Sequence, residues 1–211
     1  MKTDKKTREA AELLHKNDAG YRSNGNLHFI LYLLGLLAAV LAVRAFVFEP
    51  IKVDGESMLN TLQDGERCIV EKVSYLFTSP KSGDIVIVHY PDRGNKTFVK
   101  RVIATAGQTV EIRASEGKGD DMPYRVYVDG VLLDESVYSD TLCFDPPMVS
   151  SVIVYGNGKC TVPEGCVFVL GDHRSNSHDS RYSEVGCIAL SEVIGHVRGV
   201  MYPVKNIRPV K

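Results

Sequence analysis

The stretch Asp84-Ile85-Val86-Ile87-Val88-His89-Tyr90 decides the fold of the larger, C-terminal part of this 211-residue chain. It is a run of mostly β-branched apolar residues that ends at Pro91, as a buried strand does. Thr97–Ile103 follows within a few residues and also has the composition of a strand. Both segments therefore predict strands, and the region around them predicts a sheet.

Further segments of the chain have strand-like patterns, whereas helical patterns are scarce after residue 48. Asp129-Gly130 suits a type I′ turn, so 124–128 and 131–133 predict a hairpin. Residues 9–15 predict a short amphipathic helix before Asp18, and 58–62 predict a single turn. The remaining predicted strands are 51–53, 68–73, 109–113, 152–155, 166–170 and 193–204. The fold class expected from this pattern is mostly β.

A long apolar segment precedes the β-rich part. Leu27–Val43 contains no acidic or basic residue except His28, and the apolar run resumes after Arg44. As a helix, roughly 22 residues span about 33 Å, enough to cross a bilayer, with Arg44 close enough to the end to snorkel. A cleaved secretory signal is the alternative, but its basic region is short and its apolar core has about 7–15 residues. The length and the preceding polar tail favour one transmembrane helix over 27–48.

The distribution of cations predicts the orientation of this anchor. The tail 1–26 carries six lysines and arginines, and the equal stretch after Phe48 carries three. The positive-inside rule then places 1–26 in the cytosol. We therefore expect a single-pass protein of the cytoplasmic membrane with an extracytoplasmic domain over 49–211. Its expected core is 49–108 and 166–211, with a smaller inserted β subdomain over 109–165.

Charge and ligand-forming residues exclude several classes of function. The net charge of −1 gives no basic face for nucleic acid. The histidines have no ligand spacing, and no cysteine pair has the tight spacing of a zinc site, so no metal or cofactor is expected. The odd number of cysteines leaves at least one thiol unpaired or intermolecular. Cys143 and Cys160 could pair, but buried free thiols are an equal alternative for all five: Cys68, Cys143, Cys160, Cys166 and Cys187.

Ser57 and Lys100 suggest a catalytic pair. A serine hydroxyl is a weak nucleophile that needs a base, and no Ser/His/Asp set stands out. A lysine can serve as that base near neutral pH once its pKa falls by about two units. Such a fall means that the charged form is disfavoured by roughly 2.7 kcal/mol. Desolvation in an apolar pocket is the usual cause. On a strand, Phe98 and Lys100 share one face while Val99 and Arg101 share the other, so Lys100 can point inward. A lone strand lysine is more often solvated.

Four stretches of the chain form a recognisable set when taken in order. They are Gly55-Glu56-Ser57-Met58-Leu59-Asn60-Thr61-Leu62, Ser82-Gly83-Asp84-Ile85-Val86, Phe98-Val99-Lys100-Arg101-Val102-Ile103 with Gly107, and Gly171-Asp172-His173-Arg174-Ser175-Asn176-Ser177-His178-Asp179-Ser180-Arg181. This set resembles the type I signal peptidases. The resemblance implies a membrane-bound serine endopeptidase that removes N-terminal signal peptides from exported preproteins. It also implies a signal-peptidase-like β-fold around a LexA-like Ser/Lys peptidase core.

The same resemblance implies roles for five side chains. Ser57 matches the nucleophile and Lys100 the general base. Ser177 matches a serine whose hydroxyl orients the lysine amine. Asp179 and Arg181 match a pair that braces the site, and a purely structural salt bridge is the alternative for them.

The implied substrate is an extended peptide with small residues, Ala-x-Ala, before the scissile bond. Its backbone would add as a strand between 51–54 and 98–99. Signal peptides and the bilayer are the expected partners of a monomer. Residues expected to line the pockets are Ile51, Val53, Met58, Leu62, Phe98 and Val99, with plain core packing an equal alternative for Leu62.

Several positions depart from the family pattern. Gly55 lacks the hydroxyl that some members use in the oxyanion hole, so the Ser57 N–H, another backbone donor or a water must serve. Asn60 replaces a usual proline, 104–108 replaces a Gly-x-Pro-Gly-Asp pattern, and His173 stands where asparagine is common.

Three other functions compete with a general signal peptidase. A self-cleaving LexA-like repressor is disfavoured by the membrane span and by the lack of a helix-turn-helix segment. In a non-catalytic anchored assembly module the serine or the lysine would be lost, and both are present. A specialised enzyme for one secreted or pilus substrate stays open.

Overall fold

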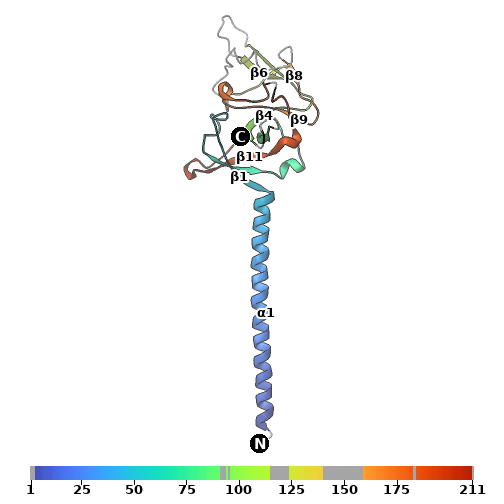
Figure 1. The fold of residues 1–211 in the computed structure, drawn as a ribbon, viewed down its shortest axis with the longest axis vertical. Helices are drawn as coiled ribbons and strands as arrows, with labels where there is room; N and C mark the ends of the chain where they lie inside the picture. The colour runs from blue at the N-terminus through green and yellow to red at the C-terminus, as the bar shows by residue number, and fades with distance from the viewer. Residues whose placement is uncertain are drawn as a thin grey trace. The chain divides into compact units, whose positions relative to one another are not determined.

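The chain divides into two compact units, Met1–Ala45 and Phe46–Lys211. In the computed structural model the first is a single helix and the second is built from strands (Figure 1). The mostly β fold class with one N-terminal apolar helix is therefore confirmed. The structure describes residues 3–90, 94, 96–114, 124–139, 159–182 and 184–210.

The helix α1 (Thr3–Phe46) is longer than the sequence pattern predicted. The short helix expected over 9–15 is only its first part, because no proline occurs before Pro50 to interrupt it. At its other end α1 stops at Phe46, and Phe48 already belongs to the first strand. The two last residues of the expected 27–48 span are thus not helical.

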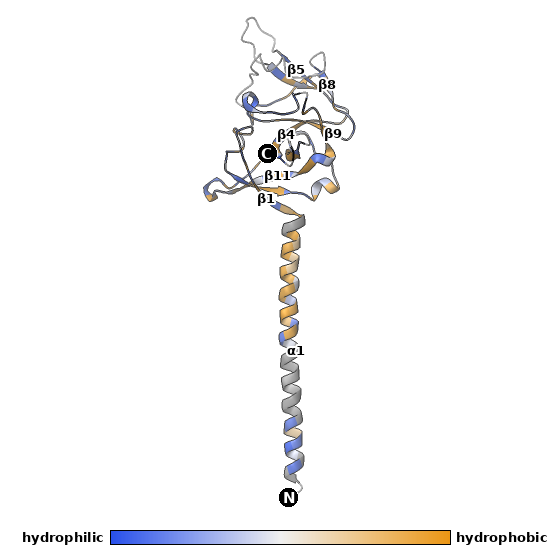
Figure 2. Cartoon of the chain, viewed as in Figure 1, coloured by the Kyte–Doolittle hydropathy of each residue, from blue (hydrophilic) through white to orange (hydrophobic). Residues whose placement is uncertain are grey.

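The apolar part of α1 is continuous and exposed. Gly25–Val43 is long and apolar enough to cross a membrane, and its large side chains are about half exposed, as Leu33 (46%) and Tyr32 (68%) illustrate. Figure 2 shows this hydrophobic stretch along the helix. Nineteen residues rise by about 28 Å as a helix, close to the thickness of a bilayer core. By length and composition this helix can span a membrane.

Eight strands form the main sheet, and all their pairings are antiparallel. The order is β1-β2-β11-β3-β4-β9-β10, with β12 also paired to β11. Pro50 is tolerated in β1 because this strand lies at the edge and pairs only with β2. The strands are β1 (Phe48–Lys52), β2 (Arg67–Glu71), β3 (Ile85–His89), β4 (Thr97–Thr105), β9 (Cys166–Leu170), β10 (Ile188–Ala189), β11 (Val193–Tyr202) and β12 (Arg208–Pro209).

A second sheet has the order β7-β6-β5-β8. Asp129 and Gly130 have φ values of 52° and 79°, which the type I′ turn predicted for this hairpin requires. The expected strand 152–155 lies outside the described residues, as does Cys143. The four strands are β5 (Thr109–Ala114), β6 (Tyr124–Val128), β7 (Val131–Leu132) and β8 (Lys159–Thr161).

Short 3-10 helices connect the strands, and 58–62 forms the predicted single turn, in which the Leu62 N–H donates to the Met58 carbonyl at 2.7 Å. The 3-10 helices are η1 (Ser74–Leu76), η3 (Arg174–Asn176), η4 (Leu190–Glu192) and η5 (Val204–Asn206).

Both faces of the main sheet are buried around β3. Ile85 and Ile87 contribute to one core cluster and Val86 and Val88 to another, as the uninterrupted apolar run predicted. A third cluster joins the two sheets, because Phe168 of β9 packs in it with residues of β5, β6 and β8. The second sheet thus shares a core with the first.

Leu62 offers a test of the core beneath the turn that follows β1. Its side chain is fully buried, so Leu62→Ala is expected to lower the free energy of unfolding by about 2–5 kcal/mol. Leu132→Ala is the matched control, since Leu132 is 48% exposed. Urea unfolding of the full chain in detergent measures both variants. Equal effects of the two substitutions would contradict the described packing.

Candidate active site

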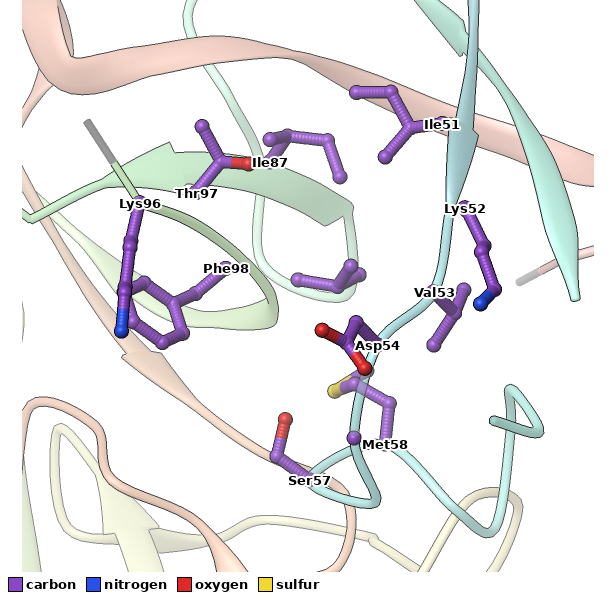
Figure 3. A pocket seen from close by; sticks show the side chains of 12 residues that line it. Ile51, Lys52, Val53, Asp54, Ser57, Met58, Ile87, Lys96, Thr97 and Phe98 are labelled. Carbon is purple, nitrogen blue, oxygen red and sulfur yellow. The ribbon is translucent and has the colours of Figure 1, made fainter. Parts of the chain in front are cut away.

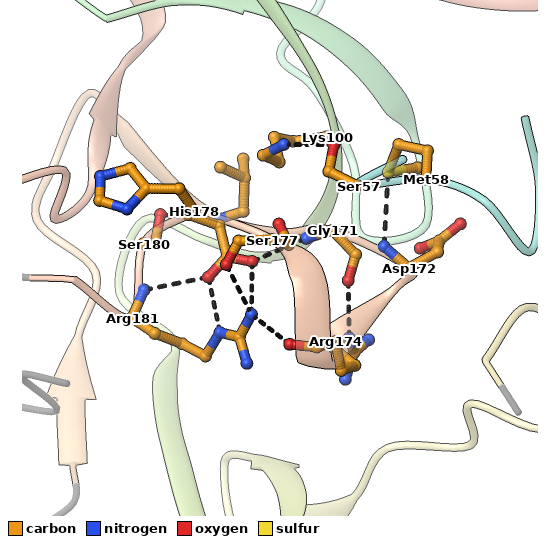
Figure 4. A network of polar contacts seen from close by, with 12 residues as sticks. Ser57, Met58, Lys100, Gly171, Asp172, Arg174, Ser177, His178, Ser180 and Arg181 are labelled. Carbon is orange, nitrogen blue, oxygen red and sulfur yellow. Dashed lines mark hydrogen bonds and ion pairs between the residues drawn. The ribbon is translucent and has the colours of Figure 1, made fainter. Parts of the chain in front are cut away.

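Ser57 and Lys100 come from separate elements and meet in the structure. Ser57 lies in the turn after β1, and Lys100 lies in β4. Lys100 Nζ is 2.8 Å from Ser57 Oγ and donates to the Val99 carbonyl at 3.1 Å (Figure 4). A hydroxyl and an amine at this distance can exchange a proton directly.

Burial changes the acidity of this lysine. The Lys100 side chain is 1% exposed, and desolvation lowers its pKa from 10.5 to about 8. The charges of Asp179 and Asp172 act in the opposite direction, and that of Arg181 adds to the lowering. The neutral amine is therefore well populated near pH 8, as a lysine base requires.

The turn that carries Ser57 is held by the segment 171–177. The His173 N–H donates to the Ser57 carbonyl at 3.0 Å, and His173 Nδ1 lies 3.1 Å from the Glu56 carbonyl oxygen. On the other side of the turn, the Gly55 N–H donates to Asp64 at 2.9 Å, and Gly55 has a φ of +100° that favours glycine. These contacts fix the backbone on both sides of the hydroxyl.

Asp179 and Arg181 form a buried pair that braces 171–177. Arg181 Nε donates to Asp179 at 2.7 Å and its Nη2 donates to the carbonyls of Arg174 and Ser177, at 2.9 and 3.1 Å. The Gly171 N–H also donates to Asp179. Burial opposes ionisation of Asp179, but Arg181 and the hydrogen bonds outweigh it, and the pKa of the carboxyl lies below its ordinary value.

Ser177 lies in the same region without a defined bond to the lysine. Its hydroxyl is buried and has no hydrogen-bond partner among the described residues, although it is near enough to Asp179 to help lower the pKa of that carboxyl. A Cβ on Gly171 would lie 2.2 Å from Ser177 Oγ and 2.5 Å from the Ser57 carbonyl oxygen. Only glycine fits there. The orienting role of Ser177 stays a prediction.

Arg101 and Asp172 were both within the recognised motifs, but no role was predicted for either. Arg101 donates two hydrogen bonds to Asp172, at 2.8 and 2.7 Å, and both side chains are buried. Arg101 also donates to the Gly83 carbonyl and lies 4.0 Å from the Tyr138 ring centroid. The available signal in the sequence was the adjacency of Lys100 and Arg101 within an apolar strand. Neighbouring strand residues point to opposite faces, so an arginine beside an inward-pointing lysine needs a charged partner on the other face if that face is also covered.

A groove of about 480 Å³ opens beside Ser57. In Figure 3, Ile51, Lys52 and Val53 lie along one side, Thr97 and Phe98 along the other, and Ser57 and Met58 at one end. Leu62 is not among the lining residues and packs in the core instead. The groove is lined by Ile51, Lys52, Val53, Asp54, Gly55, Ser57, Met58, Ile87, Lys96, Thr97, Phe98 and Val99.

Backbone groups on both walls of this groove lack a neighbouring strand. Within the described part of the chain β1 pairs only with β2, and no described strand lies along its other edge. Residues 97–100 of β4 pair with β3, but pairing with β9 begins only at Arg101. Unpaired edges of this kind can accept an extended peptide as an added strand.

Comparisons with known proteins identify the family of the chain. The family model described as "Signal peptidase, peptidase S26" matches residues 26–202. A probable signal peptidase I-1 from Synechocystis sp. is 38% identical over 178 residues, covering 81% of this chain and 80% of that protein. Signal peptidase I T from Bacillus subtilis is 32% identical over 209 residues, 99% of this chain and all of that protein.

A solved signal peptidase I from Enterococcus faecalis V583 is 28% identical and covers 57% of this chain and 97% of that structure. The TM-score between the two structures is 0.35. The family match extends from the apolar helix through β11, and together with the two relatives it confirms the resemblance that the four motifs indicated. On this evidence the chain belongs to the signal peptidase family, peptidase S26.

Proposed function

We propose that this chain removes N-terminal signal peptides from exported preproteins, with Ser57 as the nucleophile and neutral Lys100 as the general base. The observation that carries the proposal is the 2.8 Å distance between Lys100 Nζ and Ser57 Oγ beside an open groove. The lowered pKa of Lys100 supports it, because an ammonium group could not accept the proton.

The proposed reaction has two stages. The Lys100 amine takes the Ser57 proton as Oγ attacks the scissile carbonyl carbon, and the resulting ammonium then protonates the leaving amine. This leaves the signal peptide as an ester on Ser57. In the second stage Lys100 takes a proton from the water that attacks the ester carbonyl, and it returns this proton to Ser57 Oγ as the ester bond breaks. The signal peptide leaves with a new carboxyl group, which ionises in solvent. No metal or cofactor is needed for either stage.

The oxyanion of each tetrahedral intermediate needs hydrogen-bond donors. Among the described residues the Ser57 N–H has no acceptor, so it is available for this role. Gly55 provides no side-chain donor. We propose the Ser57 N–H as one donor, with the bonds from His173 to the Ser57 and Glu56 carbonyls holding its orientation.

Substrate selection follows from the shape of the groove. An extended segment can bond to the free edges of 51–54 and 97–100. Val53, Met58, Phe98 and Val99 would then line a shallow apolar pocket that accepts alanine, with Ile51 at the next pocket and Leu62 supporting it from the core. This arrangement supports cleavage after Ala-x-Ala.

The anchor supports the proposed location. With 1–26 in the cytosol, the catalytic domain 49–211 lies outside, and the nine residues from Phe48 to Ser57 reach at most roughly 30 Å from the bilayer. Signal peptides leave the membrane within this zone. We propose action as a monomer, because Ser57 and Lys100 already meet within a single chain.

The first test removes the proposed base and nucleophile. Ser57→Ala and Lys100→Met are each expected to reduce cleavage of an Ala-x-Ala preprotein by at least about a thousandfold. Full-length protein in detergent is assayed by gel, with circular dichroism to check the fold. Lys81→Met is the matched control, since Lys81 is exposed.

Cleavage by the Lys100→Met variant at the wild-type rate would contradict the assignment of Lys100 as the base for Ser57. Assaying the wild type on a panel of preproteins also measures how many different substrates the enzyme cleaves. Cleavage of a single member of the panel would favour the specialised enzyme over a general one.

The second test is the pH dependence of kcat/KM. Lys100 must be neutral, and its pKa is about 8. Below that value kcat/KM should fall about tenfold for each pH unit, and above it the rate should level off. The profile is measured with a substrate that has no titratable side chain near the cleavage site, and circular dichroism checks the fold at each pH. A flat profile between about pH 6 and 9 would contradict a lysine base.

A further inference from the structure

Two cysteine thiols lie in contact between the two sheets. Cys160 belongs to β8 of the four-stranded sheet, and Cys187 directly precedes β10 of the main sheet. Their sulfur atoms are 3.6 Å apart. Cys68, in contrast, packs in a different core cluster. Neither Cys160 nor Cys187 has a part in the proposed peptidase chemistry.

The surroundings of the pair favour a structural role over a reactive one. Both thiols pack in the cluster that joins the sheets around Phe168, where Cys160 is 2% exposed and Cys187 is half-buried. Burial raises the pKa of both thiols, that of Cys187 to about 12. Thiols with raised pKa values are poor nucleophiles at neutral pH.

We propose that Cys160 and Cys187 form a disulfide bond in the mature protein, which cross-links the two sheets. The inference rests on the proposed orientation, because a domain outside the cytosol meets oxidising conditions. Bond formation needs the sulfur atoms to approach from 3.6 Å to about 2.05 Å. This pairing differs from the Cys143–Cys160 pair considered from the sequence.

The oxidant is a disulfide of an extracytoplasmic thiol–disulfide oxidoreductase or of a small molecule. While the exported chain folds, and before burial raises the pKa values of the thiols, the Cys187 thiolate attacks one sulfur of that disulfide, which forms a mixed disulfide and releases one thiol. The Cys160 thiolate then attacks the Cys187 sulfur, forms the intramolecular bond and releases the second thiol. The two cysteines lose two electrons and two protons, and the oxidant gains both.

The bond would close a loop that includes the proposed catalytic supports. Cys160 and Cys187 are 27 positions apart, and the chain between them contains β9 together with Ser177, Asp179 and Arg181. Closing a loop of this length restricts the unfolded chain and thereby stabilises the folded one. The effect expected is on the thermal stability of the site, while the geometry of Ser57 and Lys100 stays as it is.

Mass spectrometry tests the pairing directly. The full-length protein is purified from membranes without reductant, its free thiols are alkylated, and the digest is searched for linked peptides. A Cys160–Cys187 link, about 2 Da lighter than the two reduced peptides together, is the expected result. Free Cys160 and Cys187, before and after incubation with oxidised glutathione, would overturn the proposal. So would a link from either of them to Cys143 or Cys166.

Thermal unfolding provides the second measurement. Reduction of the wild type should lower its Tm by on the order of 5–10 °C. Cys160→Ala and Cys187→Ala should each abolish this dependence on reductant, and the double variant should lose it no further. Cys166→Ala is the matched control, because Cys166 packs against the same cluster and should retain the dependence. A wild type whose Tm is the same in both redox states would contradict the cross-link.

Cleavage assays separate this inference from the proposed function. Cys160→Ala and Cys187→Ala should cleave an Ala-x-Ala preprotein at the wild-type rate at a temperature well below Tm. Active protein with every thiol free would overturn the disulfide and leave the peptidase assignment intact.

Discussion

The desolvation of Lys100 is the constraint on which the rest of the structure depends. Lowering its pKa from 10.5 to about 8 corresponds to about 3 kcal/mol of disfavoured charge. This disfavoured charge lowers the free energy of unfolding at any pH at which the buried lysine is protonated. The main sheet offsets it with two covered faces around β3 and β4. Lys100 is therefore built into the sheet rather than placed on an exposed loop.

The register of β4 keeps this constraint in place. Adjacent residues of a strand point to opposite faces, so a slip by one residue would exchange Lys100 for Arg101. The buried pair of Arg101 with Asp172 opposes such a slip, because moving Arg101 to the other face would leave both charges without a partner. Asp172 also belongs to the segment that supports the Ser57 turn. One ion pair thus links the strand of the proposed base to the segment behind the proposed nucleophile.

The sequence predicted the features whose signal is local. The apolar run of β3, the Asp129-Gly130 hairpin and the apolar part of α1 are each encoded by neighbouring residues, and the structure agrees with all three. Strands of two or three residues, such as β10, are too short for a pattern. Their formation depends on partners from elsewhere in the chain.

In the candidate site too, features encoded by neighbouring residues were predicted, whereas contacts between distant residues were not. Ser57 and Lys100 were found because they lie in recognisable motifs, although 43 positions separate them. The Arg101–Asp172 pair was missed because it joins residues 71 positions apart, and neither motif states which residue of the other it contacts. The Cys160–Cys187 contact was missed for the same reason. The sequence had left a Cys143–Cys160 pair open, and Cys143 lies outside the described residues. The observed contact arises because Cys160 of β8 lies beside Cys187 at the start of β10.

The pairing of Asp179 with Arg181 allows the segment 171–177 to be held by charged side chains while the nearby Lys100 amine stays neutral. A buried carboxylate alone would favour the ammonium form of the lysine, and Asp179 does raise the Lys100 pKa. Arg181 lowers it, so the pair as a whole adds little net charge near the amine. The pair can therefore supply hydrogen bonds to Gly171 and to the carbonyls of Arg174 and Ser177 without restoring the proton to the lysine. A single charged residue could hydrogen-bond to the segment 171–177, but its charge would shift the Lys100 pKa. An ion pair with no net charge makes the same hydrogen bonds, so desolvation remains the main determinant of that pKa.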